Sequence, residues 1–233
     1  RVWLYNGQRE GRQHGTGAEF ISLNAERVRP LLDDLSFSEG AALGIPCMTA
    51  HFSVFSNGPV DGKTVFVPGG AGAVGNYVIQ WAKWGGAKVI STVSSDDKAA
   101  DAKTAGADVT INYREENVAE RVLAETGGEG VDVSLDCTAG AGTIPVLLGI
   151  EALKRKGGTL LIQGDVAEFP NFPLGKIANK YITVKAARGH NYESCELALK
   201  QLNSDRLNLD QITTHRYALK DTHEAINAVG GSG

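Results

Sequence analysis

Short apolar runs alternate with amphipathic stretches from Lys63 onward, and this rhythm dominates the chain. Each apolar run is strand-sized and rich in β-branched residues, and the stretch after it has helical spacing. The pattern predicts six strands, at Thr64–Val67, Lys88–Val93, Val109–Asn112, Val131–Asp136, Thr159–Gln163 and Ile182–Ala186. The predicted helices lie near 74–85, 96–105, 117–126, 142–154, 173–180 and 192–203. Strand–helix alternation of this kind predicts an α/β fold with a doubly wound, parallel, six-stranded sheet.

The two ends of the chain follow a different pattern. Val2–Tyr5 and Glu19–Leu23 are predicted to be short strands with no helix between them. Near the other end, a strand at Ile212–Tyr217 is predicted to precede a helix at Thr222–Val229. We therefore expect both flanks to lie outside the alternating sheet.

A helix is predicted to join the first flank to the sheet. Ser36 and Glu39 have the spacing of a capping box, which marks a helix start. The helix should be disturbed near Pro46, because proline has no backbone N–H to donate, and should resume from Ala50 to Phe55. The predicted domain boundaries accordingly divide the chain into residues 1–34, 35–203 and 204–233.

Composition narrows the classes of partner. The chain has 233 residues, 42% of them apolar, and a net charge of −4, which is ordinary for a globular protein with a core. It has no basic stripe for nucleic acid and no apolar run long enough to cross a membrane. The three cysteines form no CxxC pair, so neither a disulfide framework nor a compact zinc site is expected, and a cytoplasmic location fits best.

Both ends of the chain fall inside patterned segments. Arg1 lies within a predicted strand, and Gly233 ends a GGSG segment. We interpret the chain as a piece of a longer protein, in which case a targeting segment could precede it unseen.

The loop after the first strand of the sheet reads VPGGAGAVG (67–75) and contains the GxGxxG pattern. It follows a predicted strand and opens a helix, which is the context that dinucleotide binding requires. Gly70 is expected to permit the tight turn, Gly72 to let the backbone approach a pyrophosphate, and Gly75 to bring the helix close to the sheet. The phosphate would lie at a helix N-terminus, where N–H groups and the helix dipole favour negative charge. A simple tight turn is the alternative interpretation.

The end of the second strand bears on the type of dinucleotide. An acidic residue at that place normally binds the ribose hydroxyls of NAD. Here the strand ends at Val93 and is followed by Ser94 and Ser95, with Lys98 close behind, whereas Asp96 and Asp97 are better placed to begin the next helix. Two hydroxyls and a lysine can surround a 2′-phosphate, which favours NADPH. The alternative is that the serines cap a helix and Lys98 is a surface residue.

Four segments together resemble the quinone oxidoreductase (zeta-crystallin-like) branch of the medium-chain dehydrogenase/reductase superfamily. They are GIPCMTAHFSVF (44–55), VFVPGGAGAVG (65–75), INYREEN (111–117) and GGSG (230–233), and the resemblance covers essentially the whole chain. It implies a Rossmann domain inserted into a GroES-like, β-rich catalytic domain, usually in a homodimer. It also implies zinc-independent, NADPH-dependent reduction of quinones or related conjugated carbonyls. The active-site aromatic residues of the family would precede Arg1, so no catalytic residue is assigned.

The resemblance implies cofactor contacts residue by residue. They are Thr49 near the nicotinamide; Ala71, Gly72, Ala73 and Val74 at the pyrophosphate; Ser94, Ser95 and Lys98 at the 2′-phosphate; Tyr113 by the adenosine phosphate; Gly164 on the nicotinamide side; and Ala186 and Ala187 at the next strand end. Without the resemblance, Tyr113 would be interpreted as an aromatic residue at the edge of the core, and Thr49 as a buried helix threonine.

Zinc is not expected in this chain. Zinc-dependent relatives place a ligand cysteine four residues before the threonine of this helix, and that position is Ile45. Cys47 is interpreted as a buried small residue. The histidines are scattered and are interpreted as surface or capping residues; they are His14, His51, His190, His215 and His223.

The expected reaction is hydride transfer from NADPH to an electron-poor acceptor, for which the protein supplies position and electrostatics. No acid–base pair stands out, which suits a quinone because its reduced oxygens can take protons from water. Two alternatives stay open. One is an NADPH-dependent alkenal or enoyl-thioester reductase, and the other is a non-catalytic, crystallin-like or sensor protein that binds NADPH.

Overall fold

The computed structural model describes residues 1–4, 7, 15–202 and 207–229. These residues belong to two compact units. One unit comprises Arg1–Gly44 together with Leu209–Gly233, and the other is the continuous stretch Ile45–Asn208. The predicted boundaries fall after residues 34 and 203, whereas the two units divide after Gly44 and after Asn208.

The larger unit is built on a six-stranded parallel sheet, as predicted. Its strands are β3 (Thr64–Val67), β4 (Lys88–Val93), β5 (Val109–Asn112), β6 (Val133–Asp136), β7 (Thr159–Ile162) and β8 (Thr183–Ala186). Their order across the sheet is β5-β4-β3-β6-β7-β8. Counted from the first strand this order is 3-2-1-4-5-6, the arrangement of a Rossmann dinucleotide-binding domain.

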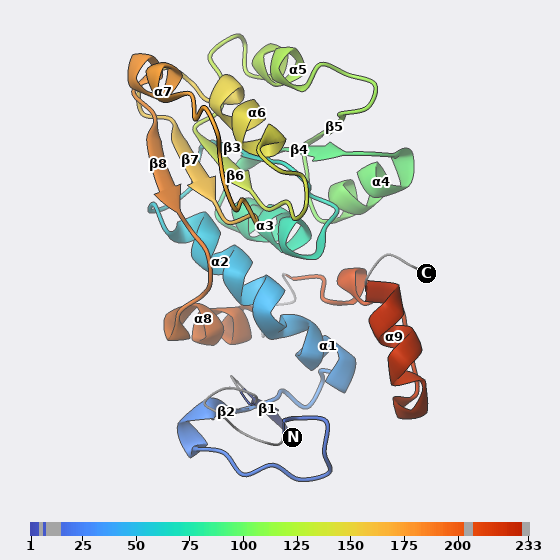
Figure 1. Cartoon of the computed structure of the whole chain (residues 1–233). Helices are drawn as coiled ribbons and strands as arrows, with labels where there is room; N and C mark the ends of the chain where they lie inside the picture. The colour runs from blue at the N-terminus through green and yellow to red at the C-terminus, as the bar shows by residue number, and fades with distance from the viewer. Residues whose placement is uncertain (5–6, 8–14, 203–206, 230–233) are drawn as a thin grey trace. The chain divides into compact units, whose positions relative to one another are not determined.

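Helices cover both faces of this sheet (Figure 1). They are α3 (Ala73–Trp84), α4 (Asp96–Thr104), α5 (Val118–Glu125), α6 (Ile144–Ala152) and α7 (Leu174–Lys180). Helices α5, α6 and α7 lie on one face, and α3 lies on the other with α2 (Met48–Phe55) packed against it. Helix α8 (Tyr192–Leu202) packs against α2. In the part of the chain that the structure describes, no helix combines the length and the apolar character needed to span a membrane.

The core lies between the sheet and the helices. Phe66, Ile90 and Leu160 from the strands pack in one buried cluster with Val122 of α5 and Ile150 of α6. The central strands β3 and β6 are largely buried because helices cover both faces of the sheet, and even the polar residues of β6, Ser134 and Asp136, are fully buried.

The predicted capping box at the start of α1 (Phe37–Ala42) is confirmed. The Ser36 N–H donates to Glu39 Oε2 at 2.6 Å, and the Glu39 N–H donates to Ser36 Oγ at 3.1 Å. The predicted disturbance is also present, in the segment Leu43–Cys47 (η2), which contains Pro46 and a non-helical backbone at Gly44 (ψ −147°). Helix α2 follows it.

The smaller unit contains the strand predictions that were wrong. Glu19–Leu23 and Ile212–Tyr217 are not strands, and only Ile212 lies in a 3-10 helix, η3 (Asp210–Ile212). Instead β1 (Val2–Leu4) pairs antiparallel with β2 (Val28–Pro30), a strand that the sequence did not predict. Helix α9 (Thr222–Val229) is as predicted, and two more 3-10 helices are η1 (Ala25–Arg27) and η4 (Leu219–Asp221). Tyr5, His14 and the GGSG segment lie outside the described residues.

The wrong predictions share a physical cause. A strand requires a partner with which to form a hydrogen-bonded ladder, and apolar character alone does not provide one. Phe20 in the first of these segments is 90% exposed, so its ring does not contribute to a buried strand face. Trp3 is buried, and its opposite neighbour in the β1–β2 ladder is Arg29.

Candidate functional site

The sheet brings the carboxyl ends of six strands to one edge. The strand order reverses between β3 and β6, so this edge contains the crevice where open α/β sheets bind ligands. All the residues predicted to bind the cofactor except Thr49 lie at the ends of these strands, in the loops that follow them, or in the first turn of the next helix. The last group is Ala73 and Val74 in α3 and Lys98 in α4. The fold therefore collects segments that are up to 116 positions apart in the sequence, from Ala71 to Ala187.

The loop between β3 and α3 is a tight turn stabilised from the neighbouring strand. Gly69 has a left-handed backbone (φ 76°), and its N–H donates to Thr92 Oγ1 of β4 at 3.1 Å. The Gly72 N–H donates back to the Gly69 carbonyl at 3.0 Å. The left-handed residue of the turn is thus Gly69, whereas the sequence analysis gave the turn to Gly70.

Gly70 and Gly75 are required by packing. A Cβ on Gly70 would lie 1.9 Å from Ser91 Oγ, and a Cβ on Gly75 would lie 2.3 Å from the Gly69 carbonyl oxygen. Gly75 therefore lets the first turn of α3 approach the glycine turn, whereas the sequence was interpreted as placing Gly75 where the helix approaches the sheet.

The N-terminus of α3 is open at this turn. Gly72 is the N-cap residue and has no side chain to cap the helix. Gly72 and Ala73 are exposed, and Ala71 and Val74 are half-buried. The Gly72 N–H is already bonded to the Gly69 carbonyl, so the free donors of this helix end are the amides that follow Gly72. Gly72 itself leaves space for a ligand because it has no side chain. Such an uncapped, glycine-lined helix start fits the pyrophosphate of a dinucleotide.

The residues after β4 combine a helix cap with an exposed lysine. Ser94 is buried, whereas Ser95 is the N-cap residue of α4 and its Oγ accepts the Lys98 N–H at 3.4 Å. Asp96 and Asp97 occupy the first turn of α4, as predicted. The Lys98 side chain is exposed. The capping role of Ser95 is therefore present, and its hydroxyl proton remains a possible donor to a ligand because a hydroxyl both donates and accepts.

Tyr113 follows β5 and does not fill the edge of the core, because its side chain is 51% exposed. Its N–H donates to the Val93 carbonyl at 3.1 Å, which fixes it beside the end of β4. The interpretation of Tyr113 as a core-edge aromatic is therefore wrong, and the ring is available at the surface of this edge.

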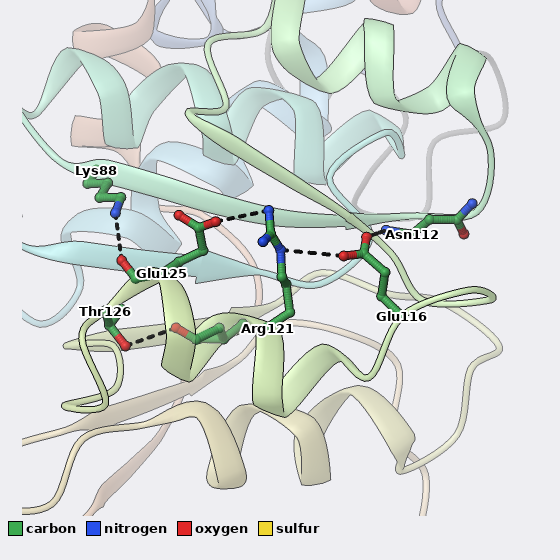
Figure 2. Close-up of polar contacts among 7 residues, drawn as sticks. Lys88, Asn112, Glu116, Arg121, Glu125 and Thr126 are labelled. Carbon is green, nitrogen blue, oxygen red and sulfur yellow. Dashed lines mark hydrogen bonds and ion pairs between the residues drawn. The ribbon is translucent and has the colours of Figure 1, made fainter.

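Side chains of α5 hold the loop that carries Tyr113 (Figure 2). Glu116 Oε1 accepts the Asn112 N–H at 3.0 Å. Arg121 pairs with Glu116 at 3.4 Å and with Glu125 at 2.9 Å, so it bridges the loop and the helix end. Within the INYREEN segment, Glu116 therefore fixes the shape of the loop, and Asn117 caps α5 by accepting the Glu120 N–H.

The residues predicted on the nicotinamide side are buried to different degrees. Gly164 follows β7 and is half-buried, Ala186 is exposed, and Ala187 is fully buried. The Ala187 carbonyl accepts a hydrogen bond from Ser53 Oγ of α2 at 2.8 Å. Thr49, also in α2, is only 3% exposed, and its Oγ1 has no hydrogen-bond partner among the described residues.

Asp136, the last residue of β6, was not among the residues predicted for the site. Its side chain is fully buried at the point where the strand order reverses. Burial raises the pKa of Asp136 above its ordinary value, against the lowering effect of two hydrogen bonds from Thr138. The only signal in the sequence was a carboxylate at the end of the predicted strand VDVSLD, which is too common a pattern to identify a site.

The described residues contain no group of three or more histidine, cysteine, aspartate or glutamate side chains that could hold a metal ion. Cys47 is fully buried, as predicted, and its carbonyl accepts a hydrogen bond from Trp81 Nε1 at 3.2 Å. His51 is not a surface residue: it is 7% exposed, packs edge-on against Trp81, and burial lowers its pKa to about 4. The described part of the chain therefore does not fit a zinc site, and zinc independence of the protein stays a prediction.

Comparison with known proteins identifies the family. The model of the zinc-binding dehydrogenase family matches residues 73–204, more than half of the chain. The chain therefore belongs to the zinc-binding dehydrogenase family, within the medium-chain dehydrogenase/reductase superfamily of oxidoreductases.

Individual relatives carry different activities in their names. The chain is 30% identical to D-arabitol-phosphate dehydrogenase of Enterococcus avium over 220 residues, covering 93% of this chain and 61% of that protein. It is 32% identical to quinone oxidoreductase of Salmonella typhimurium over 221 residues, covering 91% and 67% respectively. The solved structure of a mycobacterial protein complexed with NADPH is similar with a TM-score of 0.73 and 31% identity, covering 94% of this chain and 70% of that one.

The chain spans 61% and 63% of the length of the first two curated relatives, so their activities describe proteins longer than this one.

Proposed function

We propose that this protein is an NADPH-dependent oxidoreductase that reduces a quinone or a related conjugated carbonyl without zinc. The observation that carries the proposal is the open, glycine-lined start of α3 beside β3, next to the switch in strand order. The uncapped amides of Ala73 and Val74 would receive the pyrophosphate of the cofactor. When bound, NADPH supplies a hydride to the acceptor.

The preference for NADPH rests on the end of β4. No carboxylate follows directly after Val93; two serines stand there, and the Lys98 side chain reaches solvent one helical turn away. A lysine can pair with a 2′-phosphate, whereas an acidic residue at the strand end would repel it. Asp96 and Asp97 oppose this preference electrostatically, so the contribution of Lys98 must exceed theirs for NADPH to be favoured.

The preference for a quinone rests on the metal-binding side chains that an alcohol or ketone substrate would require and that the described residues do not provide. Ile45, at the position of the ligand cysteine in zinc-dependent relatives, is apolar and 59% exposed. No metal-binding group exists among the described side chains to polarise an alcohol or a ketone. A quinone requires less assistance, because its reduced oxygens can be protonated by water. The resemblance to quinone oxidoreductase at 32% identity supports the same choice.

Calorimetric titration of the chain with NADPH and with NADH tests the cofactor assignment. Lys98→Ala should weaken NADPH binding by about 1–3 kcal/mol, the size of a charge-assisted contact, and leave NADH binding nearly unchanged. Lys103→Ala is the matched control, because Lys103 is exposed in the last turn of the same helix. Equal affinity of the wild-type chain for both dinucleotides would refute the role of Ser94, Ser95 and Lys98.

Acceptor profiling tests the reaction. NADPH oxidation with a quinone supports the proposal, whereas oxidation with an enone or an enoyl thioester alone would replace it with an alkenal or enoyl reductase. Tight NADPH binding with no turnover on any acceptor would instead indicate a binding protein.

We also propose that the protein forms a homodimer through β8. This strand is at the edge of the sheet, and its residues Thr183–Ala186 are all exposed. An edge strand presents unpaired backbone groups, which a second copy can bind, and charged residues on an edge discourage this. Light scattering should therefore report a dimer for the wild type and less dimer for Val184→Lys.

A further inference from the structure

The two oxygens of the buried Asp136 carboxyl have different surroundings. Oδ1 accepts two hydrogen bonds from one residue, the Thr138 N–H at 3.0 Å and the Thr138 hydroxyl at 2.8 Å. Oδ2 is buried and has no hydrogen-bond partner among the described residues. Asp136 therefore fixes the start of the loop after β6, and half of its carboxyl is not used in doing so.

Gly164, in the loop after β7, lies directly against the unused oxygen. A Cβ on Gly164 would lie 2.4 Å from Asp136 Oδ2 and 2.6 Å from the Thr138 carbonyl oxygen. The Gly164 N–H also donates to the Asp136 carbonyl at 3.0 Å, and the Asp165 N–H donates to the Thr138 carbonyl at 3.1 Å. These two backbone hydrogen bonds hold the loops after β6 and β7 together, with the Asp136 carboxyl packed against Gly164 between them.

Thr138 connects the same carboxyl to the glycine turn after β3. A Cβ on Gly69 would lie 2.9 Å from Thr138 Cγ2, so the threonine methyl group lies against Gly69. Gly69 is the left-handed residue of the turn that leads into α3. A contact path therefore runs from Gly164 through Asp136 and Thr138 to Gly69.

We propose that Asp136 is a positioning residue of the dinucleotide site, which holds Thr138 against Gly69 and so fixes the turn that precedes α3. This inference rests on the proposed function, because it assumes that the turn binds a dinucleotide. It also gives Gly164 a role different from a direct approach to the cofactor: Gly164 provides space for the carboxyl.

The surroundings of Asp136 favour its neutral form. None of the ion pairs among the described residues includes Asp136, and burying an unpaired charge is costly. A neutral carboxylic acid still accepts both Thr138 bonds through Oδ1. Burial raises the pKa of Asp136, which agrees with this form. Asparagine has nearly the same shape and is neutral, so Asp136→Asn should keep the position of Thr138, whereas Asp136→Ala should lose it.

Asp132 provides a matched control on the same segment. It lies just before β6, at the opposite end of the sheet, where it accepts the Thr64 N–H at 2.8 Å and pairs with Lys154. Asp132→Ala removes a hydrogen-bonded carboxyl as Asp136→Ala does, but it does so far from the glycine turn along the strand direction. A general loss of stability would weaken NADPH binding in both variants, whereas a loss of positioning would weaken it only in Asp136→Ala.

The experiment measures NADPH affinity by calorimetry and backbone hydrogen exchange at residues 69–74 in the full chain. Asp136→Ala should weaken NADPH by about tenfold or more, which corresponds to about 1.4 kcal/mol, and should speed exchange in the turn. Asp136→Asn and Asp132→Ala should stay within about threefold of the wild type and leave the turn protected. Thr138→Ser, which removes the methyl group and keeps both hydrogen bonds, should weaken binding as Asp136→Ala does.

Three results would overturn the inference. One is a folded Asp136→Ala chain with wild-type affinity and exchange, and another is a loss in Asp136→Asn equal to that in alanine. If Asp136→Ala does not fold, wild-type behaviour of Thr138→Ser decides against it. A wild-type chain that binds no dinucleotide would instead refute the proposed function, and the hydrogen-exchange comparison would still decide whether Asp136 fixes the turn.

Discussion

Adding the same methyl group at two positions of the glycine loop should separate the role of packing from that of ligand binding. At Gly75 the new Cβ would lie 2.3 Å from the Gly69 carbonyl oxygen and 2.9 Å from Gly70 Cα. At Gly72 its nearest neighbour would be the same carbonyl oxygen at 3.3 Å. Gly72 has φ −75° and ψ 162°, which any residue adopts.

The geometry sets the size of each effect. The atoms that a methyl at Gly75 would meet belong to the backbone of a hydrogen-bonded turn and cannot rotate away. Gly75→Ala should therefore lower the free energy of unfolding by about 3 kcal/mol, the upper end of the range that is typical of overpacking. At Gly72 the turn must yield by only a few tenths of an ångström. Replacing an N-cap glycine by alanine lowers the free energy of unfolding by at most about 1 kcal/mol, so the Gly72→Ala chain should remain folded.

NADPH affinity, in contrast to stability, should be sensitive to the change at Gly72. The Gly72 methyl would stand on the exposed side of the loop, where the pyrophosphate is proposed to approach, so Gly72→Ala should weaken NADPH binding by about tenfold or more without unfolding the chain. Urea titration gives the free energies of unfolding, and calorimetry of the folded variants gives the affinities. Wild-type NADPH affinity in Gly72→Ala would refute the proposed phosphate position, and equal stabilities of the two variants would refute the packing argument for Gly75.

Three further predictions concern the surroundings of the site. Burial lowers the pKa of His51 from 6.5 to about 4, so the imidazole of the unfolded chain takes up a proton first as the pH falls. The free energy of unfolding should therefore decrease between pH 6.5 and 4 by up to about 3 kcal/mol. His51→Phe should abolish this part of the pH dependence in urea titrations. Trp81→Phe removes the indole N–H that donates to the buried Cys47 carbonyl and should cost about 1 kcal/mol of stability, the net contribution of a typical hydrogen bond, measured in the same way. Burial alone would raise the pKa of Asp132, but the hydrogen bonds from Lys154 and the Thr64 N–H outweigh burial and lower the pKa below 3.8. The free energy of unfolding should therefore decrease as the pH falls below 3.8, and Asp132→Asn should remove that decrease.

Each of these predictions can fail independently. An identical pH profile for wild type and His51→Phe would show that the folded state accommodates the charged imidazole. A Trp81→Phe chain as stable as the wild type would mean that the hydrogen bond from the Trp81 indole makes no net contribution to stability. Acid sensitivity that persists unchanged in Asp132→Asn would assign it to other carboxyls.

Local sequence signals predicted most of the larger unit. The limits of β3, β4 and β5 agree with the predicted strands residue for residue, and helix ends differ by at most two residues. The Ser36 capping box was also correct. These features depend on neighbours within a few positions, such as the hydrophobic period and the reach of a cap side chain, so the sequence contains the information that decides them.

Features that depend on distant partners were predicted poorly. The antiparallel pair β1–β2 joins residues that are 24 to 28 positions apart, and neither segment indicates its partner. The exposure of Tyr113 and the burial of His51 likewise depend on what packs beside them, which the residue type does not reveal. Propensity is a weak guide wherever tertiary packing decides burial.

By itself the sequence determined the alternating architecture and the presence of a glycine-rich strand–helix turn, because both are written in short-range patterns. Only the tertiary structure decided how that turn is made: the left-handed residue is Gly69, and Gly70 and Gly75 are glycines because Ser91 and the Gly69 carbonyl leave no space for a Cβ. It also decided that Asp136 is buried between Thr138 and Gly164. The physical reason is that close approach between loops after different strands is set by the pairing of the strands, which brings together residues that have no local relation in the chain.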